Sequence, residues 1–325
     1  MADPTSALTY DDICKEVANY IGWGRTAYAS LTTAQQTEVD AHIQAGLREF
    51  YTPPLLPGQR ETHEWSFLKP WTTIVLWSTV SGTVTGVAGA GTTTLTATTS
   101  IFYPSMIGHS VVIADTGTFT VTGYTSATVI TVSGDATCVA KAISIAADGD
   151  YRLPDNFGGI IGFLYFEPTT GYPPVSVYGE GEIMRSRMSH TSPGRPLRVA
   201  IHPAACDGTT GQRYDMQVHP TPDTNYTMHY RYIVHLDKLA PGKYPLGGPA
   251  HSQTILAACL ASAELYKNDA RGVHYAEFMT RLATSIAHDR KTTSPAFMGY
   301  NGDSSQRPAV FERAAGLYYN GTEIT

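Results

Sequence analysis

The stretches Gly91-Thr-Thr-Thr-Leu-Thr96 and Tyr124-Thr-Ser-Ala-Thr-Val-Ile-Thr-Val132 lie in the part of the chain that decides the fold. Between Lys69 and Lys141 there is no lysine, arginine or glutamate, and two aspartates carry the only charges. Short runs of alternating polar and apolar residues follow one another, with glycine turns between them. This pattern is typical of a small antiparallel sandwich or barrel. We therefore predict an inserted all-β domain at residues 79–147.

A low-complexity linker is the alternative interpretation of this segment, because threonine, glycine and serine dominate it. A linker does not require large apolar side chains, whereas a folded domain needs them to form a core. The segment contains six that favour a core: Phe102, Met106, Ile107, Val111, Phe119 and Ile130.

Two helices are predicted in residues 1–52, before the insert. Thr9 followed by Asp12 is a capping-box-like start for the first helix, and Thr32 or Thr33 with a glutamine three residues later starts the second. A pair of glycines ends the first helix and a pair of prolines ends the second. The apolar residues that define the buried faces are Ile13, Val17 and Ile21, then Val39, Ile43, Leu47 and Phe50.

Strand patterns flank the insert on both sides. Residues 62–80 predict two strands, with Trp65 and Phe67 alternating with polar neighbours in the first. After the insert, a strand and turn are predicted from Tyr151, followed by an apolar strand at residues 160–166.

The clearest hairpin pattern lies further along the chain. Polar and apolar residues alternate in 214–219 and again in 226–232, and the proline-rich segment 220–225 joins the two runs. Because the period is two in both runs, we expect them to pair with each other in a fixed register.

Three more helices complete the prediction, at residues 179–190, 250–268 and 272–290. The second of these is apolar nearly all round, which indicates a central helix, and the third has a one-sided apolar stripe. Residues 291–325 are rich in glycine, asparagine, serine and proline and predict an extended C-terminal tail. The tail carries our candidate partner-binding residues: Phe311, Arg313, Leu317, Tyr318 and Tyr319.

Together these patterns predict an α+β fold. A helical bundle of two N-terminal and two C-terminal helices is joined to an antiparallel β region, and a small all-β sandwich or barrel domain is inserted into it. The domains are then residues 1–78 with 148–290, which form one discontinuous core, the insert at 79–147, and the tail.

The overall composition is poor in charge. Charged residues make up 15% of the chain, against about 25% in ordinary soluble domains. The hydrophobic share of 42% argues against disorder, and the net charge of −6 argues against a protein that wraps nucleic acid. The charge deficit is consistent with surface covered by other subunits, or with a threonine-rich monomer.

No catalytic, cofactor or metal motif stands out, so we predict no catalytic residue, cofactor or metal ligand. The chain has no G-x-S-x-G elbow and no P-loop, and its four cysteines, none in a C-x-x-C pair, are expected to be scattered buried thiols. No apolar run is long enough for a membrane span, and the N-terminus lacks the pattern of a signal peptide. Partial patterns that lack a necessary ligand or glycine involve His63 and Glu64, His229 and His235, and Asp148, Asp150 and Asp155.

One basic cluster remains, formed by Arg185, Arg187, Arg195 and Arg198. Guanidinium groups pair with phosphate, so these residues are candidates for contacts to DNA in a channel or to a neighbouring subunit. The alternative is a solvated face or a set of salt bridges.

The order of the elements resembles the head-to-tail connector or adaptor proteins of tailed bacteriophages. The resemblance covers the chain apart from the insert and the last thirty or so residues. The matching segments, in order, are Leu47-Arg-Glu-Phe-Tyr51 before the proline pair, His63-Glu-Trp-Ser-Phe67, Tyr151-Arg-Leu-Pro-Asp-Asn-Phe-Gly158, His219-Pro-Thr-Pro-Asp223 and Ala257-Ala-Cys-Leu-Ala-Ser-Ala-Glu264.

This resemblance implies a structural virion protein rather than an enzyme. Such adaptors are expected to form a ring of about twelve copies below the portal, to extend the DNA channel and to dock the tail. The implied partners are other copies of the chain, the portal protein, a tail or tail-completion protein, and DNA that passes without sequence-specific binding. The implied location is the head–tail junction of the virion, after assembly in the host cytoplasm. The alternative is a tail or baseplate protein whose β module binds a receptor or another tail protein.

Overall fold

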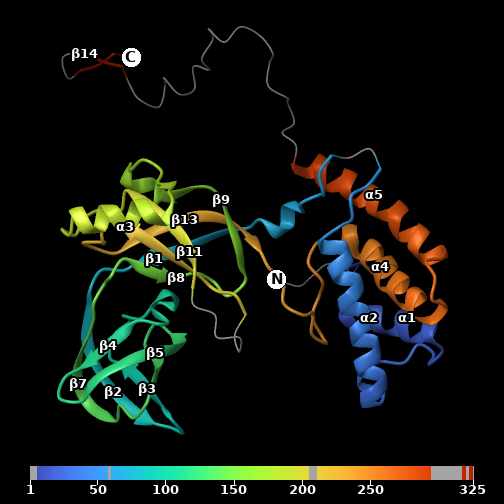
Figure 1. Ribbon diagram of the computed structural model, residues 1–325, viewed down its shortest axis with the longest axis horizontal. Helices are drawn as coiled ribbons and strands as arrows, with labels where there is room; N and C mark the ends of the chain where they lie inside the picture. Colours follow the sequence, from blue (N-terminus) through green and yellow to red (C-terminus); the bar gives the residue numbers. More distant parts are fainter. Residues whose placement is uncertain (1–5, 58–59, 205–210, 294–316, 320–321, 325) are drawn as a thin grey trace.

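A computed structural model describes residues 6–57, 60–204, 211–293, 317–319 and 322–324 (Figure 1). Its buried apolar residues fall into two separate clusters, one made by helices and one made by strands. Figure 1 shows four helices, α1, α2, α4 and α5, gathered on one side and the strands with α3 on the other. The fold is α+β, as the sequence predicted.

The N-terminal helices form where their caps predict them. Helix α1 covers Tyr10–Ile21 and helix α2 covers Thr33–Tyr51. Thr9 with Asp12, and Thr32 with Gln35, form complete capping boxes, so each helix begins with its free amides satisfied. A short 3-10 turn, η1 (Tyr28–Ser30), separates the two helices.

The C-terminal helices pack against the N-terminal pair. Helix α4 covers Pro249–Asn268 and helix α5 covers Val273–Thr293. Helix α4 contacts the other three, and its small buried residues allow that close approach. The large buried side chains of this helical core include Tyr10, Ile13, Val17, Val39, Ile43, Leu47, Phe50, Trp65, Ile255, Phe278, Leu282 and Ile286.

Two small sheets form the centre of the β region. One has the order β1-β13-β9 and the other β10-β11-β12-β8, with only β10 and β11 running parallel. Helix α3 (Glu180–Ser189), which matches the predicted helix, packs on β11 and β12. The strand bounds are β1 Trp71–Leu76, β8 Asp150–Arg152, β9 Phe157–Phe166, β10 Ser176–Val177, β11 Arg198–Pro203, β12 Tyr214–His219 and β13 Tyr226–Val234.

The predicted hairpin between residues 214 and 232 is wrong. Both strands exist, as β12 and β13, but they lie in different sheets. Met216 of β12 pairs with Ile201 and Tyr151, whereas Met228 of β13 pairs with Ile74 and Phe166. Burial alternates along the middle of β13, but in β12 the polar Gln217 and His219 are buried beside Met216 and Val218. The six-residue proline-rich connection did not force the two strands to pair with each other.

The predicted strand around Trp65 and Phe67 is also wrong. Residues Ser66–Leu68 form a 3-10 turn, η2, and the Trp65 and Phe67 rings stack on each other with centroids 5.3 Å apart. Trp65 also stacks on Phe50 of α2, with centroids 4.6 Å apart, and donates its indole hydrogen to the Phe50 carbonyl. The aromatic residues at this position therefore anchor the segment to the helices rather than form a sheet.

Six strands in the predicted insert form a closed barrel in the order β2-β3-β6-β5-β4-β7. The sequence left a sandwich or a barrel open, and the structure has a barrel. Its strands are β2 Val80–Ala88, β3 Thr92–Ala97, β4 Ser110–Ile113, β5 Gly117–Ser126, β6 Val129–Ser133 and β7 Cys138–Ile145.

The chain enters and leaves the barrel at adjacent positions, because Val80 of β2, the first barrel strand, pairs with Ile145 of β7, the last. Its interior joins the core of the two sheets in one apolar cluster. Trp77 and Tyr151 lie at this joint, where the Tyr151 hydroxyl donates to the Trp77 carbonyl at 2.7 Å. Division of the chain into separate domains therefore stays a prediction, tested by deletion below.

The chain crosses between the helices and the strands twice, through residues 52–70 and 234–248, which we call the neck (Figure 1). The Arg231 guanidinium donates to the Lys69 carbonyl at 3.1 and 3.2 Å, and the His235 amide donates to the Asn156 carbonyl at 2.7 Å. These bonds hold the two crossings at the β end of the neck. Within the described part of the chain, no helix is long and apolar enough to cross a membrane.

At the C-terminus, two short strands pair with each other in antiparallel fashion: β14 (Leu317–Tyr319) and β15 (Thr322–Ile324). Most of the predicted extended tail at residues 291–325 lies outside the described residues.

Candidate functional site

The four arginines predicted as a basic cluster have different environments. Arg187 of α3 is bound by three acceptors: the carboxylate of Asp150 at 2.7 Å, and the carbonyls of Gly149 at 2.8 Å and Val218 at 3.1 Å. Arg198 bridges from β11 to Glu182 of α3 at 3.0 Å. These two side chains therefore attach α3 to the strands beneath it.

The other two arginines form no ion pair with a described carboxylate. Arg195 stacks on the Tyr172 ring, with its guanidinium carbon 4.5 Å from the ring centroid. Arg185 is exposed. Whether these four arginines contact DNA or a neighbouring subunit stays a prediction.

The tail candidates are only partly described. Phe311 and Arg313 lie outside the described residues. Leu317, Tyr318 and Tyr319 form β14, the first strand of the C-terminal hairpin.

The acidic and histidine pairs noted in the sequence have ordinary partners. Asp148 accepts a hydrogen bond from His109 at 3.1 Å, Asp155 forms an ion pair with Arg213 at 2.8 Å, and His229 contacts Glu167 at 3.1 Å. In the described ranges, no group of three or more potential metal ligands is close enough to hold a metal ion.

A buried aspartate meets a partly buried serine and histidine where η2 touches α5. His63 contacts Asp289 at 2.9 Å, and the Ser66 hydroxyl donates to the other oxygen of the same carboxylate. Although burial opposes it, the hydrogen bonds from Ser66 and His63 lower the pKa of Asp289. A nucleophilic serine would need to donate to the histidine instead, so this arrangement is a structural bond between the neck and α5.

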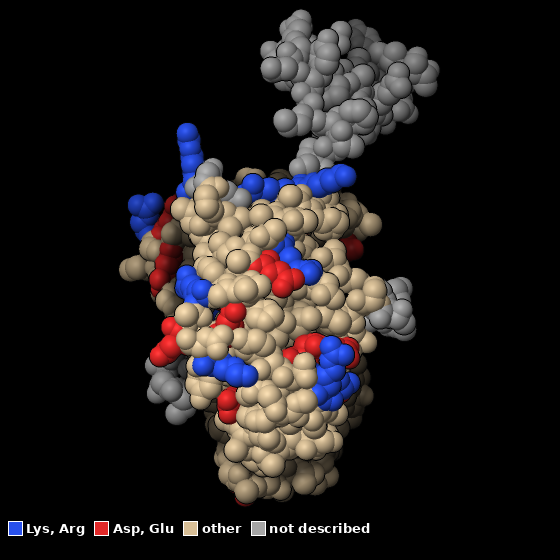
Figure 2. All heavy atoms as spheres, turned by 90° about the vertical axis from the view of Figure 1, so that its right-hand side faces the viewer, with Lys and Arg blue, Asp and Glu red and all other residues tan. Residues whose placement is uncertain are grey.

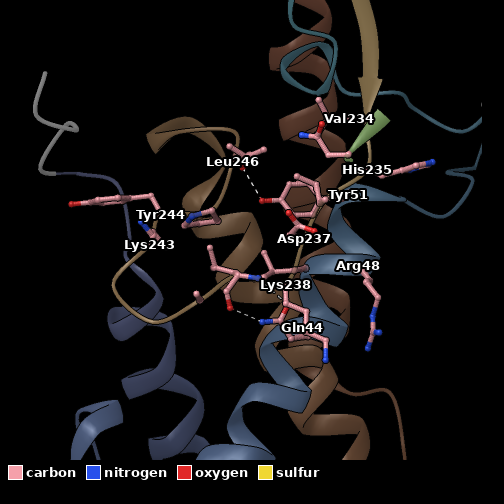
Figure 3. Close-up of a pocket in the computed structure, with 16 residues that line it drawn as sticks. Gln44, Arg48, Tyr51, Val234, His235, Asp237, Lys238, Lys243, Tyr244 and Leu246 are labelled. Carbon is pink, nitrogen blue, oxygen red and sulfur yellow. Dashed lines mark hydrogen bonds between the residues drawn. The ribbon is translucent and has the colours of Figure 1, made fainter. Parts of the chain in front are cut away.

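A groove of about 550 Å³ lies in the neck, between α2 and the segment that leads from β13 to α4 (Figure 3). Two residues of α2 fix its walls. Gln44 donates to the Leu239 carbonyl at 2.8 Å and accepts from the Leu239 amide at 3.2 Å. Tyr51 donates to the Leu246 carbonyl at 3.2 Å, and burial raises the pKa of its hydroxyl, so that it stays a donor.

The groove combines apolar walls with a basic rim, and we call it the neck groove. Arg48, Lys238 and Lys243 line it together with one acidic residue, Asp237 (Figure 3). None of these three cations forms an ion pair with another described residue. The apolar lining residues are Leu47, Val234, Leu236, Leu239, Ala240, Pro245 and Leu246.

Sequence reasoning missed this groove because its two walls are almost two hundred residues apart in the chain. The only local sign was the lysine-containing segment between the last strand and α4, which carries prolines and glycines at 241–249. A second cavity of about 540 Å³ lies beside it and shares Arg48, Tyr51 and residues 234–236 with it.

Comparison with known proteins places the chain in a family. No curated protein matches it significantly. The family described as SU10 adaptor protein matches residues 127–299, which is slightly more than half of the chain and includes β6, β7, all strands of the two small sheets except β1, and helices α3, α4 and α5. The match begins after most of the barrel, so the N-terminal helices stay outside it. The chain therefore belongs to the SU10 adaptor protein family and is a phage adaptor-type structural protein.

Proposed function

We propose that this protein forms a ring at the head–tail junction of the virion, where it extends the portal channel and docks the tail. The observation that carries the proposal is the family match, because it makes the chain an adaptor and an adaptor must join two other components. The order of helices and strands described above is consistent with this role.

Charge distribution supports a role in assembly. Figure 2 shows a face of the molecule on which lysine, arginine and acidic residues are scattered among a majority of uncharged residues. A surface with few charges costs less free energy to desolvate when two subunits come into contact. Arg187 and Arg198 are already paired with carboxylates of the same chain, which makes these two side chains less available to phosphate groups. Weak phosphate contact suits a channel through which DNA must move.

The mass of the assembled protein tests the proposal. The full chain is measured by native mass spectrometry, alone and with the portal protein of the same phage. We expect a ring of about twelve copies, either alone or on the portal. A stable trimer would contradict the proposal, and so would a monomer that does not bind the portal protein.

The exposed apolar residues of the barrel favour a second role for that part of the chain. Val87 is 67% exposed and Val139 is 77% exposed, although strands usually turn polar residues to solvent. We propose that the barrel contacts another virion protein. Replacing both valines with threonine should leave the ring intact but weaken capture of a tail protein in a pull-down. If the variant captures the tail protein as well as the unaltered protein does, the proposed contact between the barrel and that protein is wrong.

A further inference from the structure

The lining of the neck groove holds more positive than negative charge, although Asp40 lies close enough to Lys238 for the lysine charge to act on it. Its rim holds Arg48, Lys238 and Lys243, and the only acidic lining residue is Asp237. The whole chain, in contrast, has a net charge of −6. Charges of one sign that converge on a cleft attract a group of the opposite sign, so the groove is suited to an acidic group with apolar neighbours.

The groove is formed before any partner arrives. Gln44 holds Leu239 through two hydrogen bonds, and Tyr51 holds Leu246 through a third. The Tyr10 amide adds a fourth bond to the Lys243 carbonyl at 3.0 Å. A segment that enters the groove therefore meets walls that are already in position, which lowers the entropic cost of binding.

The C-terminal hairpin of β14 and β15 has the matching chemistry. It contains Glu323 with the apolar or aromatic residues Leu317, Tyr318, Tyr319 and Ile324, and no lysine or arginine follows Arg313. An isolated two-stranded hairpin is marginally stable in water and gains stability by packing on another surface. In Figure 1, β14 lies clear of the helices and strands of its own chain.

The hairpin has the reach to find a groove on a neighbouring molecule. Twenty-three residues separate Thr293, the end of α5, from Leu317. An extended chain of that length spans roughly 80 Å, which is ample for a subunit that stands next to it in a ring.

We propose that the neck groove of one copy binds the β14–β15 hairpin of a second copy. Glu323 lies beside Lys238 or Lys243, and the apolar residues of the hairpin cover the apolar walls. The inference rests on the proposed assembly of the chain with itself, and it names the contact that links one copy to the next.

Cross-linking between copies labelled with different isotopes tests this contact. Equal amounts of full-length protein with natural isotopes and with ¹⁵N are mixed, assembled and treated with a carbodiimide, which joins a lysine ammonium to a nearby carboxylate as an amide. We expect Glu323 to be linked to Lys238 or Lys243 in peptide pairs that carry one label of each kind. Lys267 is the control, because its ammonium group donates to the carbonyls of Tyr20 and Ile21 at the end of α1; it should not link to Glu323.

Links found only within one label would place the hairpin in its own groove and overturn the proposal. If the ring forms only on the portal, the links between copies should appear only when the portal protein is present; no link to either lysine in an assembled ring would overturn the proposal as well. A Glu323→Gln variant should lose the link, and because glutamine has nearly the same size and shape as glutamate the variant should fold normally.

Charge exchange gives a second measurement. Lys238→Glu with Lys243→Glu should weaken self-association by about tenfold, and adding Glu323→Lys should restore part of the loss. Circular dichroism checks that the variants are folded. A ring that forms equally well with the reversed charges would overturn this inference and leave the proposed function intact, whereas the absence of any ring would contradict the proposed function itself.

Discussion

Gly46 of α2 and Cys259 of α4 touch backbone to backbone: a β carbon added to Gly46 would lie 2.5 Å from the Cys259 α carbon. No side chain can yield here, because the nearest atoms belong to the α4 backbone. The two helices can approach this closely only because residue 46 has no side chain.

Gly46→Ala should therefore destabilise the protein by about 2–3 kcal/mol, since α2 and α4 must move apart and lose packing along their length. Urea unfolding followed by circular dichroism measures the change. Gly181→Ala in α3 is the matched control, because nothing lies within 4 Å of its added carbon. That variant should be neutral or slightly more stable. Equal stability of the two variants would contradict the close contact.

The thiols of Cys14 and Cys259 should resist alkylation in the folded protein. Burial raises the pKa of Cys14 to about 11 and that of Cys259 to about 12, so almost no reactive thiolate exists at pH 8. Both side chains are also inaccessible to reagent. Mass spectrometry after iodoacetamide treatment should find them unmodified until urea is added. Rapid labelling of Cys259 in native protein would show that α4 is not buried as described.

His109 should make the joint between barrel and sheets more stable in mild acid. It contacts Asp148 at 3.1 Å and the Asp150 carbonyl at 2.7 Å. Burial opposes the charge, but these bonds raise the pKa of His109 above its ordinary 6.5. A raised pKa contributes stability that is complete below pH 6.5 and is lost as the pH rises through the higher folded value.

The measurement is the loss of unfolding free energy in His109→Gln at two pH values. We expect a larger loss at pH 5.5 than at pH 8.5. Asp148, whose pKa is lowered in the folded state, stays ionised at both pH values, so its own titration does not contribute to the difference between the two measurements. A loss that does not depend on pH, or that grows with pH, would mean that His109 stays neutral.

Removal of the barrel tests the predicted domain boundaries. Because Val80 pairs with Ile145, the two ends of the insert are adjacent, and residue 78 can be joined to residue 148 by a short glycine-serine linker. The helical core lies in a different cluster, so the helical signal in circular dichroism should persist. The β region should lose stability where Trp77 and Tyr151 become exposed. Loss of the helical signal would show that the chain folds as one unit.

Features set by neighbours in the chain could be predicted from the sequence. The capping pairs Thr9 with Asp12 and Thr32 with Gln35 begin their helices as expected, and the charge-poor segment contains most of the barrel. Strand partners could not be predicted in this way. Met216 and Met228 sit in similar alternating runs, yet they join different sheets because the choice depends on Tyr151, Ile201 and Ile74 elsewhere in the chain.

The same limit explains the candidate site. The four arginines are close in sequence and suggested a cluster, but Arg187 and Arg198 are occupied by α3 and the strands below it. The neck groove unites Gln44 and Tyr51 with Lys238 and Leu246, and no local pattern links these positions. Only the packing of α2 beside the second crossing of the neck brings them together.

Closure of the barrel should prevent this charge-poor segment from pairing, strand to strand, with the same segment of other copies. Sheets with open edges usually carry lysine, glutamate or proline there, because unpaired backbone groups recruit strands from other molecules. In this barrel β2 pairs with both β3 and β7, so the ring of hydrogen bonds has no end at which another strand could add. Closure of the barrel therefore limits edge-to-edge strand pairing, as charged edge residues do in open sheets. Threonine-rich strands of many copies can then lie close together in a virion without forming intermolecular sheets.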